Sequence, residues 1–268
     1  MRLRESIVVL TGASGGIGLE LAEQLCHAGA QVLAVSRHMG KLASLMNRYP
    51  GSLRWQSADL RTQEGRAQVV TRARELGGFN VLINAAGVNR FALLDQLDEQ
   101  ALDELLDINL KAPLQLTRAC LPLLREQPKA LVVNVGSTYG SIGYPGYASY
   151  CASKFALRGF SEALRRELAD TPVNVLYVAP RATRTSMNSS AATALNQALK
   201  VGMDDPVYVA KAVLQAVQSE RSELYLGWPE KMFVRLNGIL PGLVDRALRK
   251  QLPLIRRHIG SHIKEPSK

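Results

Sequence analysis

Along the chain, short apolar runs typical of strands alternate with longer segments whose apolar residues have helical spacing. Several short β-branched runs are apolar on both faces, as is typical of strands covered by helices on both sides. Seven such runs predict strands: SIVVLTG (6–12), AQVLAVSR (30–37), SLRWQSADL (52–60), FNVLINAAG (79–87), ALVVNVGS (130–137), VNVLYVAP (173–180) and ELYLG (223–227). The segments with helical spacing are 18–28, 63–76, 98–125, 150–168 and 206–218. This alternation predicts an α/β protein with a doubly wound, parallel, seven-stranded sheet in one domain over residues 1–227.

The pattern changes after Gly227. Residues 228–268 have apolar positions at roughly helical spacing, interrupted by Pro241 and Pro253. Two short amphipathic helices with a turn at Pro241–Gly242 are predicted there, because proline interrupts helices. We therefore expect a basic C-terminal extension over 228–268, with a disordered tail after Gly260.

Composition narrows the class of protein. The hydrophobic fraction is 47% and the mean hydropathy is −0.03, which are typical of a soluble globular chain. No apolar run reaches the ~20 residues that span a bilayer. Cys26, Cys120 and Cys151 are widely spaced, which favours a reducing compartment and a cytoplasmic location. The cysteines and the four histidines give no metal-ligand pattern, so no metal is expected.

Charge is unevenly distributed along the chain. The formal net charge is +10, and residues 230–268 hold nine Lys and Arg against three acidic residues, a net charge of +6. Three interpretations stay open for this extension. It packs as a helix pair on the domain, it contacts an anionic membrane peripherally, or it binds nucleic acid. The third is least favoured, because the segment lacks a recognised motif and interleaved aromatic residues beyond Trp228 and Phe233, and no nucleic-acid partner is expected.

A glycine-rich turn follows the first predicted strand. TGASGGIG (11–18) has the spacing T-G-x-x-x-G-x-G between a strand and a helix. Glycines permit a tight turn and close approach of the backbone to a pyrophosphate, and the helix N-terminus offers free N–H groups to the anion. The turn therefore predicts a dinucleotide site at Gly12, Ser14, Gly15, Gly16, Ile17 and Gly18.

The end of the second strand bears on the choice of cofactor. A carboxylate at this edge would bind the ribose 2′-hydroxyl of NAD, whereas this chain has Ser36 followed by Arg37. Arginine can bind a phosphate with two hydrogen bonds, so NADP(H) is favoured over NAD(H). Asp59 and Leu60 end the third strand, where Asp59 either binds an adenine edge or caps the following helix.

The stretch YASYCASK (147–154) holds two tyrosines and a lysine. Tyr150 and Lys154 are four residues apart and share a helix face, whereas Tyr147 is two turns, or ~10 Å, from the lysine. The ammonium is expected to lower the pKa of Tyr150, which could then exchange a proton with a substrate oxygen. Ser137 would stabilise charge on that oxygen. Tyr147 is expected to line the pocket or pack on a helix, and Cys151 to be a small buried residue.

These motifs together resemble the short-chain dehydrogenase/reductase family. TGASGGIG at 11–18, NAAG at 84–87, Asn109, Ser137 and YCASK at 150–154 occur in order over residues 5–226. The resemblance implies a Rossmann fold of the NADP-preferring type. It also implies that Lys154 holds the nicotinamide ribose, and that Asn109 helps to hold a water linking the lysine to solvent. Asn84, Ala85 and Gly87 would lie at the cofactor, with Asn84 also stabilising the central sheet.

The segment after the sixth strand departs from the family pattern. Pro180 is present, Arg181 replaces the usual glycine, and Thr185 stands at the threonine position near the nicotinamide. Arg181 is expected either to change the local backbone path or to add positive charge near the cofactor or an acidic substrate. Residues 186–205 are rich in small residues and predict a mobile lid with a mostly apolar wall.

The sequence thus predicts an enzyme, an NADP(H)-dependent oxidoreductase interconverting a ketone or aldehyde and an alcohol. Reduction is the favoured direction, and the expected substrate is a hydrophobic or lipid-like carbonyl compound. The predicted catalytic residues are Asn109, Ser137, Tyr150 and Lys154. The alternative is an NADP(H)-binding sensor or scaffold without turnover. The family resemblance also implies a homodimer or homotetramer built on helices 98–125 and 150–168.

Overall fold

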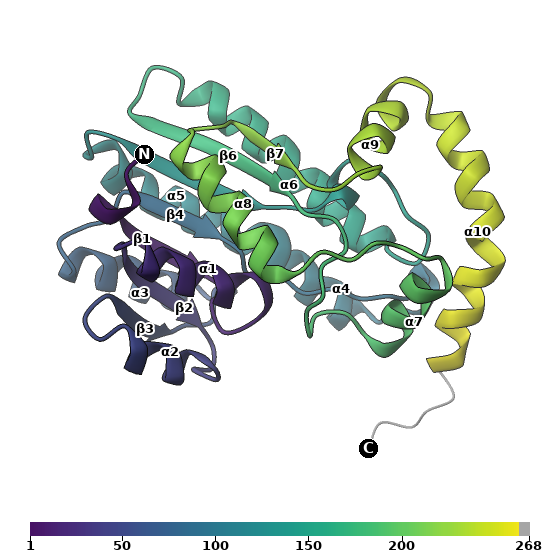
Figure 1. The fold of residues 1–268 in the computed structure, drawn as a ribbon, viewed down its shortest axis with the longest axis horizontal. Coiled ribbons are helices and arrows are strands. Elements are labelled where there is room, and N and C mark those ends of the chain that lie inside the picture. Colours follow the sequence, from purple (N-terminus) through teal and green to yellow (C-terminus); the bar gives the residue numbers. More distant parts are fainter. Residues whose placement is uncertain (263–268) are drawn as a thin grey trace.

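The seven predicted strands form one parallel sheet in the computed structural model, which describes residues 1–262 (Figure 1). The strands are β1 (Ile7–Thr11), β2 (Gln31–Ser36), β3 (Leu53–Ser57), β4 (Val81–Asn84), β5 (Ala130–Val135), β6 (Val173–Ala179) and β7 (Glu223–Tyr225). Their order is β3-β2-β1-β4-β5-β6-β7. The order reverses between β1 and β4, and in doubly wound sheets the ligand crevice lies at this reversal, beyond the carboxyl ends of the strands.

Helices cover both faces of this sheet. They are α1 (Gly16–His27), α2 (Leu42–Arg48), α3 (Gln63–Glu75), α4 (Glu99–Leu106), α5 (Ala112–Arg125), α6 (Ala148–Glu167), α7 (Ser190–Ala198), α8 (Pro206–Gln218), α9 (Glu230–Ile239) and α10 (Pro241–His262). Successive side chains of a strand point to opposite faces. On β1, Val8 and Leu10 therefore enter the core under α1 and α8, while Val9 enters the core under α3 and α5.

Two helices were not expected from the sequence. α2 has only seven residues, and α7 lies in the segment predicted to be a lid. Ser189 begins α7, because its hydroxyl accepts a hydrogen bond from the Ala192 N–H at 3.2 Å. The apolar side of α7, which includes Ala192 and Leu195, is buried.

The C-terminal extension differs from the prediction in length. α10 runs for 22 residues and continues through Pro253, so the prediction of two short helices is wrong for the second. Pro253 and Arg249, four residues earlier, are both exposed, so the Arg249 carbonyl that loses its partner can be hydrated. Beyond α10, the predicted disordered tail lies outside the described residues.

α10 covers one end of the domain through a small core of its own. Ile255 and Ile259 pack against Leu195 of α7 and against Phe91 and Tyr144. Figure 1 shows α9 and α10 at the edge of the molecule, joined to the domain mainly beside α7. The extension thereby becomes part of the wall of the crevice.

Candidate active site

The glycine-rich turn between β1 and α1 lies directly against the turn that follows β4. Gly12 has a φ of +68°, and a Cβ atom there would lie 2.7 Å from the Ala86 backbone. A Cβ atom on Gly18 would lie 2.1 Å from the Gly12 carbonyl oxygen, so glycine permits close packing of α1 on the strand. Because α1 begins at Gly16, its first N–H groups lie at this turn, where an anion can be bound.

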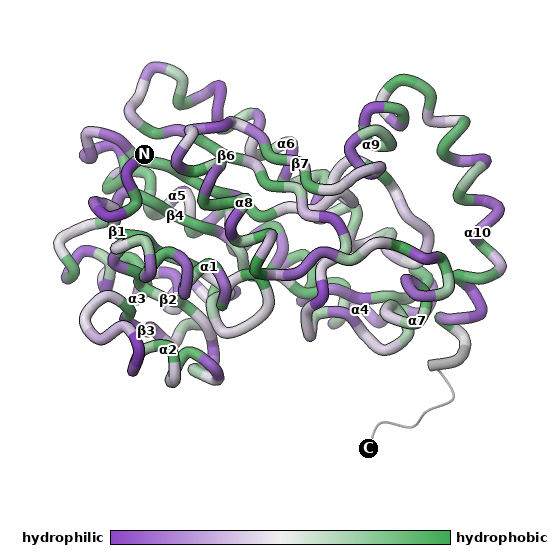
Figure 2. The backbone as a smooth tube through the Cα atoms, in the orientation of Figure 1, coloured by the Kyte–Doolittle hydropathy of each residue, from purple (hydrophilic) through white to green (hydrophobic). Residues whose placement is uncertain are grey.

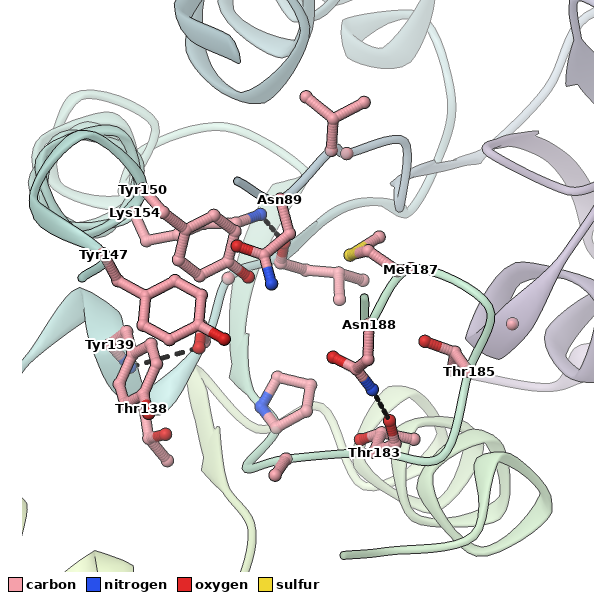
Figure 3. A pocket seen from close by; sticks show the side chains of 18 of the residues that line it. Asn89, Thr138, Tyr139, Tyr147, Tyr150, Lys154, Thr183, Thr185, Met187 and Asn188 are labelled. Carbon is pink, nitrogen blue, oxygen red and sulfur yellow. Dashed lines mark hydrogen bonds between the residues drawn. The ribbon is translucent and has the colours of Figure 1, made fainter. Parts of the chain in front are cut away.

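One cavity of about 860 Å³ extends from this turn to the C-terminal helices. Most of the predicted site residues line it: Gly12, Ser14, Gly15, Gly16, Ile17, Gly18, Ser36, Arg37, Asp59, Leu60, Ala85, Gly87, Ser137, Tyr150, Lys154, Pro180 and Thr185. Figure 3 shows Tyr150, Tyr147 and Asn89 on one side of the cavity and Thr185, Met187 and Asn188 on the other. The sequence motifs therefore converge on a single site.

Tyr150, Ser137 and Lys154 meet at this cavity. The end of β5 presents Ser137, while Tyr150 and Lys154 project from the first turns of α6. The Tyr150 side chain hydrogen-bonds to that of Ser137. The Lys154 ammonium donates to the Val135 carbonyl at 3.1 Å and lies 5.6 Å from the centroid of the Tyr150 ring. The arrangement can hold a substrate oxygen between two hydroxyl groups with a buried cation behind them.

Burial controls the protonation of both titratable groups. It raises the pKa of Tyr150 to about 12, although the hydrogen bond to Ser137 lowers that pKa in part. It also lowers the pKa of Lys154 to about 8. At neutral pH Tyr150 therefore holds its proton, which is the state that a proton donor needs.

The expectation that Lys154 lowers the pKa of Tyr150 stays a prediction, since no direct bond joins the two groups here. The ammonium lies over the tyrosine ring and is bonded to the Val135 carbonyl, not to the phenolic oxygen. Desolvation of the phenolate is the larger effect, and it acts in the opposite direction. Helical spacing had correctly predicted the shared face.

Comparison with known proteins then decides the family. The sequence model of the short chain dehydrogenase family matches residues 6–196. The chain belongs to the short-chain dehydrogenase family. Curated relatives are consistent with this assignment. The oxidoreductase YxnA of Bacillus subtilis is 30% identical over 99% of this chain and 76% of its own length.

Two other short-chain dehydrogenase relatives have names that state a reaction. The 3-oxoacyl-[acyl-carrier-protein] reductase FabG of Vibrio cholerae is 30% identical over 80% of this chain and 90% of its own. The ketoacyl reductase HetN of Nostoc is 30% identical over 90% of this chain and 88% of its own. Both names describe reduction of a ketone on an acyl chain.

Solved structures match the whole fold. A short-chain dehydrogenase from Streptomyces avermitilis has a TM-score of 0.78 and 28% identity, covering 96% of this chain and 98% of its own. A second, from Burkholderia cenocepacia in complex with NADP, has a TM-score of 0.79 and 25% identity, covering 92% of this chain and 99% of its own. The doubly wound Rossmann fold predicted from the sequence is confirmed.

Short-chain dehydrogenases bind NAD or NADP, and the residues present here fit such a cofactor. Besides the cradle at Gly12, a Cβ atom on Gly87 would lie 3.2 Å from Asn109 Oδ1 and 3.7 Å from Lys154 Nζ. Glycine thus leaves the floor of the cavity open beside the buried lysine. Thr185 approaches the glycine-rich turn from the other side, since its Cγ2 lies 3.1 Å from the position of a Cβ on Gly16.

Among residues 1–262, the carboxyl end of β2 has an exposed cation and no unpaired carboxylate beside it. Arg37 is exposed and lines the cavity. The hydroxyl of Ser36 donates to the His38 carbonyl at 2.7 Å and accepts from Trp55 Nε1 at 3.0 Å, so its single proton is used within the protein. Any contact of Ser36 with a cofactor would therefore use its backbone or its remaining lone pair.

Asp59 pairs with a neighbour that the sequence analysis missed. Its carboxylate accepts hydrogen bonds from the Arg61 guanidinium at 2.6 and 3.0 Å, and these lower the pKa of Asp59. The cap of α3 is Thr62, whose hydroxyl accepts from the Gly65 N–H at 3.0 Å. The alternative that Asp59 caps this helix is therefore wrong.

Two predicted site asparagines, Asn84 and Asn109, are buried outside the described lining of the cavity. Asn84 Nδ2 donates to Asn134 Oδ1 at 2.8 Å and to Thr117 Oγ1 at 3.1 Å, so its side chain joins the central strands to α5. The Asn84 side chain thus bonds within the core, and these bonds give no support to its predicted contact with the cofactor.

Asn109 lies in a π-helical turn between α4 and α5, a feature frequent at functional sites. Its Oδ1 accepts from the Val88 N–H at 2.8 Å, and its Nδ2 donates to the Val88 carbonyl at 2.9 Å and to Ser153 Oγ at 3.2 Å. Asn109 therefore fixes the backbone just after Gly87. One lone pair of its Oδ1 takes no hydrogen bond from the described residues.

Arg181 has a role that neither sequence alternative described. Its guanidinium bonds to the Asp204 carboxylate at 2.7 Å and to Glu230, at the start of α9, at 3.3 Å. It also donates to the Trp228 carbonyl at 3.2 Å. The charge is thus neutralised within the protein, and Arg181 attaches the C-terminal extension to the segment after β6.

An aromatic wall on the substrate side of Tyr150 was largely missed. Tyr139 stacks on Tyr144 at 5.1 Å between centroids, and Phe91 stacks on Tyr147 at 5.0 Å. Tyr147 lines the cavity, as predicted. Tyr144 hydroxyl also donates to Gln251 Oε1 on α10 at 3.0 Å. The sequence does show four tyrosines within residues 139–150, and Phe91 is the fifth aromatic residue of the wall. Their spacing follows neither a helical nor a strand period, so the sequence pattern alone does not place them together.

Proposed function

We propose that this protein is an NADPH-dependent reductase of a ketone or aldehyde carried on an apolar, acyl-like chain. The observation that carries the proposal is that Ser137, Tyr150 and Lys154 share one cavity with the glycine-rich turn and with the apolar faces of α9 and α10. The names of the two acyl-ketone reductases among the relatives support the substrate class.

The residues of the chain account for the proton side of the reaction. When bound, NADPH supplies the hydride for the carbonyl carbon. Ser137 and Tyr150 can hold the carbonyl oxygen between their hydroxyls, and Tyr150 gives its proton as charge develops there. Lys154 keeps donors for the ribose hydroxyls, since only one of its three goes to Val135. Asn109 Oδ1 and Lys154 Nζ both lie near Gly87, and the remaining lone pair of this oxygen suits a water that links the lysine to solvent.

The outer part of the cavity favours an apolar substrate. Beyond the tyrosines, the lining includes apolar side chains from the segment after α7 and from both C-terminal helices: Leu199, Val201, Phe233, Leu236, Val244, Ala247 and Leu248. Burial of each methylene of a substrate chain against such a wall contributes about 0.8 kcal/mol. A long chain should therefore bind better than a short one.

A substrate series tests this function. The purified protein with NADPH is given simple aldehydes and 3-oxoacyl thioesters of increasing chain length, and oxidation of NADPH is followed by absorbance. We expect turnover, with kcat/KM rising along the series. Tight binding of NADPH without turnover of any carbonyl would instead favour the sensor or scaffold alternative.

The preference for NADPH is expected to depend on Arg37. Replacing Arg37 by glutamine removes a charge-assisted contact with the 2′-phosphate and should weaken NADPH binding by roughly 10- to 100-fold. NADH binding, measured by the same fluorescence titration, should change little. The control is Lys41→Gln, which removes an exposed cation four residues away. Equal weakening of both cofactors by Arg37→Gln would contradict the assignment of Arg37 to the phosphate.

A further inference from the structure

The turn between α9 and α10 exposes large apolar side chains. Ile239 is 76% exposed, Leu240 50% and Leu243 49%; we call these three residues the α9–α10 corner. Met232 is 49% exposed and lies two helical turns before Ile239, on the same face of α9. Figure 2 shows the turn as hydrophobic at the edge of the molecule, away from the sheet. A contiguous exposed apolar patch marks an interaction site.

Cations lie along both helices that meet at this corner. α9 and α10 carry seven, Lys231, Arg235, Arg246, Arg249, Lys250, Arg256 and Arg257, against the two acidic residues Glu230 and Asp245. Among the described residues of these helices, Glu230 is the one in an ion pair, and its partner is Arg181 in the domain. Six of the seven cations are exposed, Lys231 being half-buried. The corner thus belongs to a pair of helices with a net charge of +5 whose described cations form no ion pair.

The corner is also continuous with the cavity. Leu243 is half exposed and lines the cavity, as do Phe233 and Leu236 on α9. The same cavity is lined by Tyr150. An apolar molecule held outside the corner would therefore meet an apolar surface that leads inward.

We propose that the α9–α10 corner docks onto the surface of an anionic lipid bilayer, with Ile239, Leu240 and Leu243 in the boundary between headgroups and acyl chains. Amphipathic helices with apolar and cationic faces bind in this way. No helix within residues 1–262 is long and apolar enough to cross a membrane, so the contact is peripheral. A second copy of the chain fits less well, because a symmetric interface would bring the same cations together.

Vesicle co-sedimentation tests the proposal without measuring turnover, so its failure is distinguishable from failure of the proposed reaction. The full-length protein is mixed with vesicles of phosphatidylcholine alone or of phosphatidylcholine with phosphatidylglycerol. We expect binding to the anionic vesicles to be roughly tenfold tighter or more than to neutral ones, and to weaken as salt is raised.

Two variants separate the apolar and the charge contributions. Ile239→Ser/Leu240→Ser and Arg246→Gln/Arg249→Gln/Lys250→Gln should each reduce binding roughly tenfold or more. None of these five residues lines the cavity, so NADPH titration reports whether each variant is folded. The matched control removes three exposed cations from β3, α3 and α5, at the other end of the molecule (Figure 1): Arg54→Gln/Arg74→Gln/Arg125→Gln, which should bind like the wild type.

Three results would overturn the proposal. The wild type does not bind anionic vesicles, it binds neutral ones equally well, or the control loses as much binding as the corner variants. The wild type could fail to bind vesicles and form an oligomer that the serine variant dissociates. In that case the corner is an interface between copies of the chain.

Discussion

Replacing Tyr150 by phenylalanine is expected to remove most carbonyl reduction while leaving NADPH binding intact. Phenylalanine keeps the ring over which Lys154 lies, 5.6 Å from the centroid, and removes only the hydroxyl that bonds to Ser137. A positioned proton donor contributes roughly 10²- to 10⁴-fold to a rate. We expect kcat to fall by about that factor, with the Kd for NADPH changing less than about threefold because the cavity keeps its shape.

Tyr147→Phe is the matched control for this experiment. It also removes one buried phenolic hydroxyl from the same cavity, three residues earlier on the chain. Because Asn89, and not Ser137, is the polar side chain that acts on the Tyr147 hydroxyl, kcat should change only a few-fold. If Tyr150→Phe retains turnover similar to that of Tyr147→Phe, another group donates the proton and the assignment of Tyr150 is wrong.

The fold could be predicted because its determinants are local. Runs such as IVVL at 7–10 have no polar face, which is required of a strand covered on both sides, and all seven runs became strands. The shared face of Tyr150 and Lys154 follows in the same way from their helical spacing. Glycine at 18 also has a local cause, since a Cβ atom there would meet the Gly12 carbonyl oxygen.

Features that depend on distant contacts could not be predicted. Tyr144 bonds to Gln251 of α10 and packs beside Ile255, and Tyr139 stacks on Tyr144, so this wall depends on residues about 100 positions further along the chain. The pKa of Tyr150 depends on how completely the site is desolvated, which one sequence segment does not reveal. α10 continues through Pro253 because that position faces solvent. The exposure of a single residue is set by tertiary packing, so the sequence alone does not reveal it.

Arg181 is the clearest case of such a distant contact, and its removal should have a large effect on stability. Its carboxylate partners, Asp204 and Glu230, are 23 and 49 residues away in sequence. The Arg181 side chain is only 20% exposed and that of Asp204 8%. Arg181→Ala would leave a buried carboxylate without its cation, and breaking a buried pair in this way is strongly destabilising. We expect the free energy of unfolding, measured in urea, to fall by about 2–4 kcal/mol.

Two further variants test the cause of this loss. Arg184→Ala is the control, because Arg184 is 61% exposed and lies 3.9 Å from Asp205; a surface pair of this kind contributes at most about 1 kcal/mol. The double variant Arg181→Ala/Asp204→Asn should recover part of the stability, since it removes the unpaired charge as well. In Arg181→Ala, amide hydrogens of α9 should also exchange faster than those of α1, because Glu230 no longer attaches α9 to the domain. A stability loss no greater than that of Arg184→Ala would mean that these ion pairs behave as solvated surface contacts, and that packing of α10 on α7 alone holds the extension.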